Sequence, residues 1–333
     1  MSDSPSIPRP ALYRSNPSEA TLTDTSIIYI DSIYNNNNNN NNSNNNCHLS
    51  SKTLIDKHHH QQKRYANYPS WIIPWRNFRY KHREFFAEFI GTFVLVLLIN
   101  GISAEQTLGV TGTKSWLTTS FGSGLAVLVA ISISGHVSGA HLNPAVTLTF
   151  WIYSGFPKKK VLPYISAQMM GAFSGSAILY TMIHPAIDIF DEGERQINGP
   201  MGTAGIFATY PPFYVGPYTA IASEILGTAL LLLLIMVTGH PNNSPFYSMQ
   251  GFMVAAGLMI ISLALGYTSG FSLNPARDIG PRVFTAIAGW GVDVFTVSNY
   301  YAFIPMFAPL FGGVLGGFVY TVFIDADEPA PAC

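Results

Sequence analysis

Two eight-residue segments of the chain carry residue types that could bind a solute. The pattern Ser-Gly-x-x-Leu-Asn-Pro-Ala occurs at 138–145 and again at 269–276. Asn is a favoured helix N-cap and Pro suits the first helical position, so each segment predicts a helix that begins at its proline. A helix N-terminus presents free N–H groups and a partial positive charge. Together with the amides of Asn143 and Asn274, these two ends would offer donors to a neutral hydroxylic solute and repel cations. The motif expected to hold the ends in place also includes Pro144, Ala145, Pro275 and Ala276.

Ionisable side chains lie next to the second segment and inside apolar stretches. Arg277 follows Asn274 by one helical turn, and we expect it to point into the same passage as a donor and a positive barrier; the alternative is an ion pair with Asp278. We expect Asp278 itself to be a brace. Glu88 and Glu224 lie within apolar runs, where a carboxylate is costly and therefore marks function. They could relay protons or accept hydrogen bonds from irregular backbone, and their symmetric placement favours the second role.

Histidines near the first segment allow several interpretations. His136 and His141 could ligate a metal, gate by pH or brace the loop, and we favour bracing. His58, His59 and His60 are adjacent and cannot all face one ion without strain, so we expect no metal site and no cofactor. No catalytic base, nucleophile or nucleotide-binding loop is apparent, which argues against an enzyme. A net charge of -1 without a basic domain argues against nucleic-acid binding.

Composition places these residues in a membrane. Only 11% of the 333 residues are charged, against about 25% in soluble domains. A membrane helix needs about 20 mainly apolar residues, and five longer stretches lack Asp, Glu, Lys and Arg: 115–157, 161–187, 196–223, 225–276 and 294–324. The sequence therefore predicts an all-α membrane protein with two half-helices and six spans at about 85–104, 117–137, 162–184, 219–238, 249–268 and 301–323.

The two halves of the chain repeat each other. Ala-Glu-Phe-Ile-Gly-Thr at 87–92 matches Ser-Glu-Ile-Leu-Gly-Thr at 223–228, and the two Asn-Pro-Ala segments follow in the same order. Three spans in each half give the halves opposite orientations, which is an inverted repeat. The half-helices would then enter from opposite sides and meet near the midplane. Irregular backbone at that depth is tolerated only where it is buried or lines a wet cavity, so the pattern predicts a pore.

The remaining segments set the domain organisation and the orientation. We expect a disordered cytosolic extension with an Asn tract at 1–83, a channel domain at 84–324 with repeats at about 84–184 and 219–323, and a short cytosolic tail at 325–333. Basic residues cluster at 76–83 and 158–160, which places both termini in the cytosol by the positive-inside rule. The cluster at 76–83 could also bind anionic membrane lipid, although a topology role suffices.

The chain resembles the major intrinsic proteins, the aquaporin and glycerol-facilitator family. The resemblance covers about 84–324 and includes both Asn-Pro-Ala boxes and the paired Glu-x-x-Gly-Thr openings. Segments at 204–211, 274–282 and 288–291 resemble the glycerol-conducting branch, and the long N-terminal extension resembles fungal members. The resemblance implies passive flux of glycerol, similar small neutral solutes and water through a homotetramer, and we expect it in the plasma membrane. A water-selective channel, or a non-conducting sensing or adhesion protein on the same scaffold, are the alternatives.

The resemblance also implies four positions at the narrowest point. Counting back without gaps from each box places them at Ser123, Ser262, Phe271 and Arg277. An error of one turn would replace Ser123 by Phe121. The expected constriction is a Phe–Arg wall facing two serines, without the histidine expected of a water-selective filter. Since pore width and lining donors decide passage, solutes up to the size of glycerol should pass.

Overall fold

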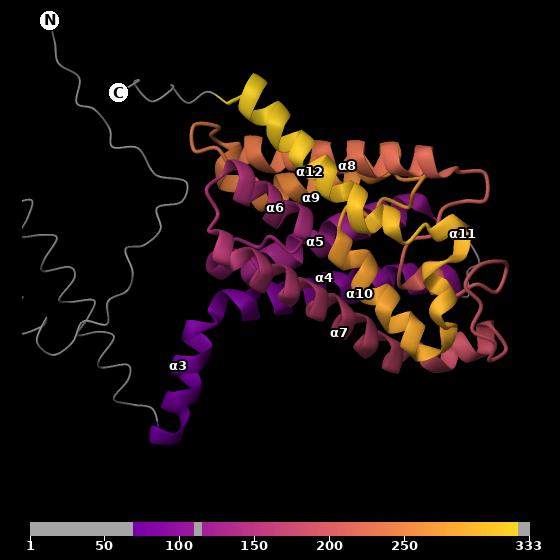
Figure 1. The fold of residues 1–333 in the computed structure, drawn as a ribbon. Helices are drawn as coiled ribbons and strands as arrows, with labels where there is room; N and C mark the ends of the chain where they lie inside the picture. The colour runs from indigo at the N-terminus through magenta and orange to yellow at the C-terminus, as the bar shows by residue number, and fades with distance from the viewer. Residues whose placement is uncertain (1–68, 110–114, 326–333) are drawn as a thin grey trace, which may run out of the picture. The chain divides into compact units, whose positions relative to one another are not determined.

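The computed structural model describes residues 69–109 and 115–325, and the chain divides into two units, Met1–Lys81 and His82–Cys333. In the described part of the first unit, a 3-10 turn, η1 (Ser70–Ile72), leads into a short helix, α3 (Ile73–Lys81). The second unit holds the long helices (Figure 1).

The described part of the second unit is built mainly from six long helices and two half-helices. The long helices are α4 (Arg83–Leu108), α5 (Trp116–Ser138), α7 (Lys158–Phe190), α8 (Pro217–Thr238), α9 (Gln250–Leu265) and α12 (Phe303–Phe323). The half-helices are α6 (Pro144–Tyr153) and α10 (Pro275–Thr285). Short turns complete it: η2 (Ala204–Ile206), η3 (Phe246–Met249), η4 (Ala286–Trp290), η5 (Val292–Phe295) and α11 (Val297–Tyr300). The predicted all-α architecture is confirmed, and the six predicted spans match the long helices to within a few residues.

Five helical segments in the described part of the chain are long and apolar enough to cross a membrane: Arg83–Leu108, Trp116–Ser138, Pro217–Thr238, Phe246–Leu265 and Val297–Phe323. The remaining long helix, α7, has 33 residues and encloses Pro163 and Pro185. Polar residues such as Gln168 and Ser176 lower its apolar content, and both are buried inside the bundle. Its polarity therefore serves internal contacts.

Helix packing reproduces the inverted repeat. In the first half α4 packs against α5 and α7, and in the second half α8 packs against α9 and α12. The half-helices cross over: α6 packs mainly against α12, and α10 packs against α7. Figure 1 shows α8 and α12 side by side and α10 next to α7. Each half-helix is thus held by the opposite half of the chain.

Glycines allow the close helix crossings. A Cβ atom on Gly171 of α7 would lie 2.4 Å from the carbonyl oxygen of Phe89 in α4, and one on Gly316 of α12 would lie 2.3 Å from that of Ala229 in α8. Real Cβ atoms do not approach carbonyl oxygens so closely. Small residues at helical spacing let backbones meet in lipid, where the hydrophobic effect does not drive helix association.

The α4–α7 crossing supplies a matched test of this packing. Gly171→Ala overpacks the crossing, and we expect it to lower the free energy of unfolding in detergent by about 1–3 kcal/mol. Gly101 of α4 is the control, because its added Cβ would meet only Leu179 of α7, at 3.9 Å. Gly101→Ala should leave stability unchanged or slightly raised. Equal destabilisation by both changes would show that the crossing does not need a glycine.

Candidate functional site

The two asparagines cap the half-helices. The side-chain oxygen of Asn143 accepts a hydrogen bond from the N–H of Ala145 at 2.8 Å. That of Asn274 accepts from the N–H groups of Ala276 and Arg277, at 2.9 and 3.2 Å. Both asparagines have extended backbones, and the proline after each occupies the first helical turn. The local sequence therefore ends the irregular loop and starts the helix at the same residue.

The same asparagines join the two halves of the chain. The amide nitrogen of Asn143 donates to the carbonyl oxygen of Leu273, and that of Asn274 donates to the carbonyl oxygen of Leu142, both at 2.8 Å. Each amide reaches the loop of the other repeat, so the N-termini of α6 and α10 meet. A side-chain amide has two N–H donors, and one on each asparagine remains for a further partner.

Two buried glutamates hold the loops that precede the half-helices. Glu88 accepts hydrogen bonds from the backbone N–H groups of residues 141–142, at 2.9 and 2.8 Å, and from the side chain of Gln168 at 2.8 Å. Glu224 accepts from the N–H groups of residues 272–273, at 3.0 and 2.8 Å. Neither carboxylate is exposed. The hydrogen bonds of both carboxylates with described residues come from donors, which is a bracing geometry.

The loops need such braces because their backbone is strained. Side chains other than glycine rarely adopt positive φ, yet four residues do so here: Ala140 (50°), Leu142 (55°), Phe271 (45°) and Leu273 (50°). This backbone turns successive carbonyl groups away from helical partners. Among the described residues, none donates a hydrogen bond to the carbonyl groups of 139–141 or 270–272. Six acceptors are therefore left for a solute or water.

A tyrosine holds the first carbonyl of each loop. The hydroxyl of Tyr164 donates to the carbonyl oxygen of Ser138 at 3.0 Å, and that of Tyr301 donates to the carbonyl oxygen of Ser269 at 2.6 Å. Tyr164 is the seventh residue of α7 and Tyr301 lies two residues before α12, so in each half the donor comes from the N-terminal part of the third long helix or from just before it. The sequence analysis missed both residues, although their position before an apolar run in each repeat could have revealed them.

Arg277 is held by the loop that contains Phe207, which belongs to neither half-helix. Its guanidinium donates to the carbonyl oxygen of Phe207 at 3.1 Å, and only 8% of the residue is exposed. The structure shows no ion pair between Arg277 and Asp278 among the described residues. Asp278 instead pairs with Arg282, whose Nε lies 2.8 Å from its carboxylate.

The Asp278–Arg282 pair positions the loop that holds Arg277. Asp278 accepts from the N–H and the hydroxyl of Thr209, at 2.8 and 2.6 Å. Arg282 donates to the carbonyl oxygens of Thr209 and Val294, at 2.5 and 2.9 Å, and is fully buried. The pair therefore fixes Thr209, two residues after the carbonyl that Arg277 uses. Arg282 is a third residue that the sequence analysis did not single out, after the two tyrosines.

A tryptophan contributes to the residues expected at the constriction. The rings of Trp116 and Phe271 meet edge to face, with centroids 5.4 Å apart, and the indole N–H donates to the carbonyl oxygen of Ser262 at 3.1 Å. The hydroxyl of Ser262 pairs with that of Ser120 at 2.7 Å. The buried hydroxyl of Ser123 has no partner among the described residues. Of the two expected serines, only Ser123 keeps an unused hydroxyl.

Phe121, the alternative aromatic residue, is 54% exposed, whereas Ser123 is buried. Trp116 supplies an aromatic ring instead. Residues 116, 120 and 123 lie on one face of α5 because their spacing follows the helical period. That spacing could have pointed to Trp116, but counting back from the Asn-Pro-Ala box tested only one position.

The two histidines differ in their surroundings. His141 is buried, its Nδ1 lies 3.1 Å from the hydroxyl of Thr147, and its ring contacts Phe156 and Tyr164, with centroids 4.7 and 5.0 Å away. His136 is exposed on α5 and has no hydrogen bond or ion pair with any described residue. The expectation that His136 braces the loop is therefore wrong: it precedes the loop in sequence but does not face it. The described residues contain no group of three metal-ligating side chains, and residues 58–60 lie outside them.

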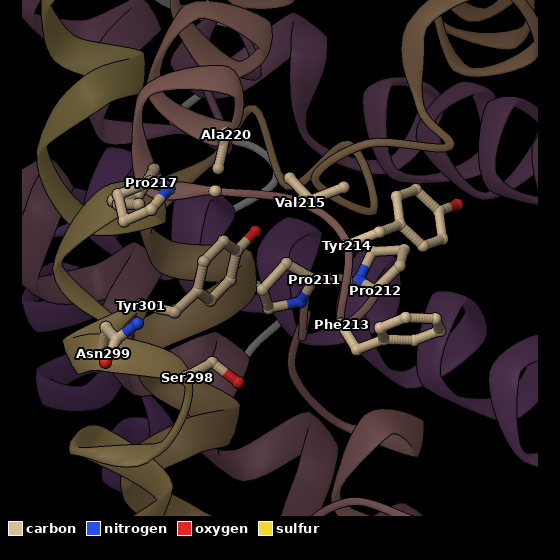
Figure 2. Close-up of a pocket in the computed structure, with 12 residues that line it drawn as sticks. Pro211, Pro212, Phe213, Tyr214, Val215, Pro217, Ala220, Ser298, Asn299 and Tyr301 are labelled. Carbon is tan, nitrogen blue, oxygen red and sulfur yellow. The ribbon is translucent and has the colours of Figure 1, made fainter.

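A cavity of about 320 Å³ lies beside the second tyrosine (Figure 2). Its walls come from the loop at 211–216, the start of α8, α11 and the start of α12. None of its lining side chains is charged, and Tyr301 is itself almost fully buried. Figure 2 shows Tyr301 near Pro211 and Pro217. One of its lining residues is therefore the tyrosine whose hydroxyl donates to the carbonyl oxygen of Ser269.

An inverted repeat of membrane helices, with two half-helices joined at their N-termini, defines a channel. The sequence model of the major intrinsic protein family matches residues 75–320, and the chain belongs to this family. Family members are channels and not enzymes, which agrees with the expectation from sequence.

Relatives of the chain include proteins named as aquaporins and as aquaglyceroporins. Aquaporin-2 and Aquaporin-1 of Rhizopus delemar are 63% and 68% identical over 260 and 235 residues, covering 78% and 71% of this chain and 82% and 77% of theirs. Aquaglyceroporin-2 of Rhizophagus irregularis is 44% identical over 74% of this chain and 78% of its own. The X-ray structure of the aquaglyceroporin from Plasmodium falciparum is 33% identical, with a TM-score of 0.65 over 73% of this chain and 96% of that one.

The tyrosine contact gives a direct prediction. Tyr301→Phe leaves the buried carbonyl of Ser269 without its donor, and we expect the free energy of unfolding in detergent to fall by about 1–3 kcal/mol. Tyr218→Phe is the control, since Tyr218 is 89% exposed and should change stability by less than about 0.5 kcal/mol. Indistinguishable unfolding curves for wild type and Tyr301→Phe would contradict a holding role for this hydroxyl.

Proposed function

We propose that this channel conducts glycerol and other small neutral solutes together with water. The observation that carries the proposal is the meeting of the two half-helix N-termini through Asn143 and Asn274. Their spare amide N–H groups and the unpaired carbonyls of residues 139–141 and 270–272 give a solute both donors and acceptors. The positive helix ends and Arg277 disfavour cations.

The outer aromatic pair supports glycerol as a substrate. Trp116 and Phe271 form an apolar corner next to Ser262, and Phe271 comes six residues before Arg277 in the chain. A molecule with a hydrocarbon backbone and hydroxyl groups can place its carbons against the rings and its oxygens toward donors. No histidine stands at position 262 to narrow the passage for water alone.

The other residues take supporting roles in this proposal. The lining residues are Asn143, Asn274, Ser123, Ser262, Phe271, Arg277 and His141, to which we add Trp116. The framework residues are Pro144, Ala145, Pro275, Ala276, Glu88, Glu224 and Asp278, to which we add Tyr164, Tyr301 and Arg282. They keep the loop backbone in place and do not themselves contact the solute.

A water-selective channel is the competing function. It is favoured by the names of the two Rhizopus relatives, which are more similar to this chain than the aquaglyceroporins named above. Direct flux measurement separates the two, because a water-selective channel would pass water but not glycerol. A protein that passes neither would be a non-conducting member of the family.

The proposed organisation is a channel domain at 84–324 between an N-terminal extension and a short tail. The channel lies in the plasma membrane with both ends of the chain in the cytosol, and four copies form the assembly. An ion pair supports the shared side of the two basic segments, since the Lys160 amine lies 2.8 Å from the Glu84 carboxylate. At the other end of α7, Arg195 forms ion pairs with two acidic residues, Asp188 and Asp191. Burial alone would lower the pKa of Arg195, but its hydrogen bonds with Asp188 and Tyr180 raise it.

Proteoliposome flux tests the proposal and the role of Trp116 together. Wild-type protein should pass water and glycerol but exclude pentitols and hexitols. Trp116→Ala removes the apolar corner, so we expect larger polyols to enter at least several-fold faster while water flux persists, because pore width sets the cutoff. Stopped-flow light scattering with a polyol series measures this cutoff.

Trp151→Ala serves as the matched control, because Trp151 is a partly exposed residue of the half-helix α6 and not a member of the aromatic pair. It should keep the wild-type cutoff. Glycerol exclusion by the wild-type protein would overturn the proposed substrate. An unchanged cutoff in Trp116→Ala would overturn only the assignment of Trp116.

A further inference from the structure

The short helix α3 carries aromatic and basic side chains on neighbouring faces. Trp75 and Phe78 are three residues apart and share a face, with ring centroids 5.8 Å apart. Arg76 and Arg79 have the same spacing, displaced by one residue, so they lie about 100° around the helix. No residue of α3 is buried, and the helix contains no Asp or Glu.

The aromatic side chains of this segment expose much of their surface. The exposed fractions are 54% for Trp75 and 48% for Phe78, and Trp71 in the preceding turn reaches 76%. Contiguous exposed apolar side chains mark a surface that meets a partner or a membrane. Amphipathic helices that lie in a membrane interface combine Trp and Phe on one face with Lys and Arg on the polar face.

Chain connectivity keeps this helix near the bilayer. α3 ends at Lys81, and α4, one of the membrane-capable helices, begins at Arg83. Two residues span at most about 7 Å of extended chain. A single residue, His82, therefore joins α3 in the chain to a helix that can cross a membrane.

We propose that α3 is a membrane-surface anchor that inserts Trp75 and Phe78 among lipid headgroups and binds anionic lipids through Arg76 and Arg79. The absence of acidic residues from α3 makes its charge complementary to anionic headgroups. Aromatic side chains favour the interface because they present an apolar body and, in Trp, a polar N–H. This inference depends on membrane insertion but not on which solute the channel conducts.

Site-directed spin labelling of the full-length protein tests the depth of each face. In a background with Cys47→Ser and Cys333→Ser, single cysteines replace Trp75, Phe78, Asn77 or Tyr80, and the labelled proteins are placed in nanodiscs. Nanodiscs contain phosphatidylcholine alone or mixed with phosphatidylserine. Oxygen, which partitions into lipid, should broaden the labels at 75 and 78. A water-soluble nickel chelate should reach those at 77 and 80, which lie on other faces.

Charge variants test the lipid class. A basic residue near an anionic surface contributes enough to favour the bound state about fivefold, so Arg76→Gln with Arg79→Gln should reduce the bound-to-free ratio of α3 about 25-fold in the anionic nanodiscs. Lys158→Gln with Lys159→Gln removes the same charge from the segment at the start of α7 and should leave the ratio unchanged. Glycerol and water flux of each variant reports separately on folding and on the proposed function.

Two results would overturn the proposal. Nickel access at 75 and 78 equal to that at 77 and 80 in anionic nanodiscs would show that α3 does not lie on the membrane. Oxygen access at 75 and 78 that is independent of phosphatidylserine and of the arginines would show that anionic lipid is not its ligand.

Discussion

Backbone N–H and C=O groups that leave a helix inside a bilayer must find partners in the protein or in a wet cavity. This constraint governs residues 139–143 and 270–274, where the chain stops being helical between a long helix and a half-helix. Glu88 and Glu224 take up N–H groups of the two loops, and the asparagine amides take up one carbonyl in each. The carbonyls that remain unpaired are then held in fixed positions.

Both repeats contain a bracing glutamate, but the residues around the two half-helices differ between the repeats. The third residue after the cap proline is Thr147 in α6 and Asp278 in α10. The hydroxyl of Thr147 forms hydrogen bonds with Gln168 and His141, which are both buried. Asp278 instead forms a charged network with Arg282 that fixes the loop supporting Arg277. The position that holds Thr147 in the first repeat thus holds Asp278 in the second repeat, where it forms an ion pair with Arg282.

The sequence predicted the features that depend on residues close together in the chain. The spans, the half-helices and the caps at Asn143 and Asn274 follow from apolar runs and from Asn-Pro, and the structure has them. Counting along α5 to Ser123 did not identify the aromatic partner of Phe271, because Trp116 contacts it from two turns before the expected position. His136 shows the opposite kind of error: it is close to the loop in sequence, yet it forms no hydrogen bond with the loop.

The tyrosine contacts and the Asp278–Arg282 network join segments that are far apart in the chain. Tyr301 reaches a loop 32 residues earlier, and Thr209 lies 69 residues before Asp278. No periodic pattern encodes such pairs. The internal repeat is the one sequence feature that could have exposed the tyrosines, by asking which side chain occupies the same place in both halves.

The central claim is that the two asparagine amides join the half-helices and donate to the passing solute. Permeability of Asn143→Asp and Asn274→Asp proteoliposomes tests it most directly, because each change replaces a donor by a carboxylate that faces a carbonyl oxygen now 2.8 Å away. We predict that water and glycerol permeability per molecule both fall at least about tenfold, corresponding to about 1.4 kcal/mol, while the protein remains folded. Folded variants with wild-type permeability to both would contradict the claim.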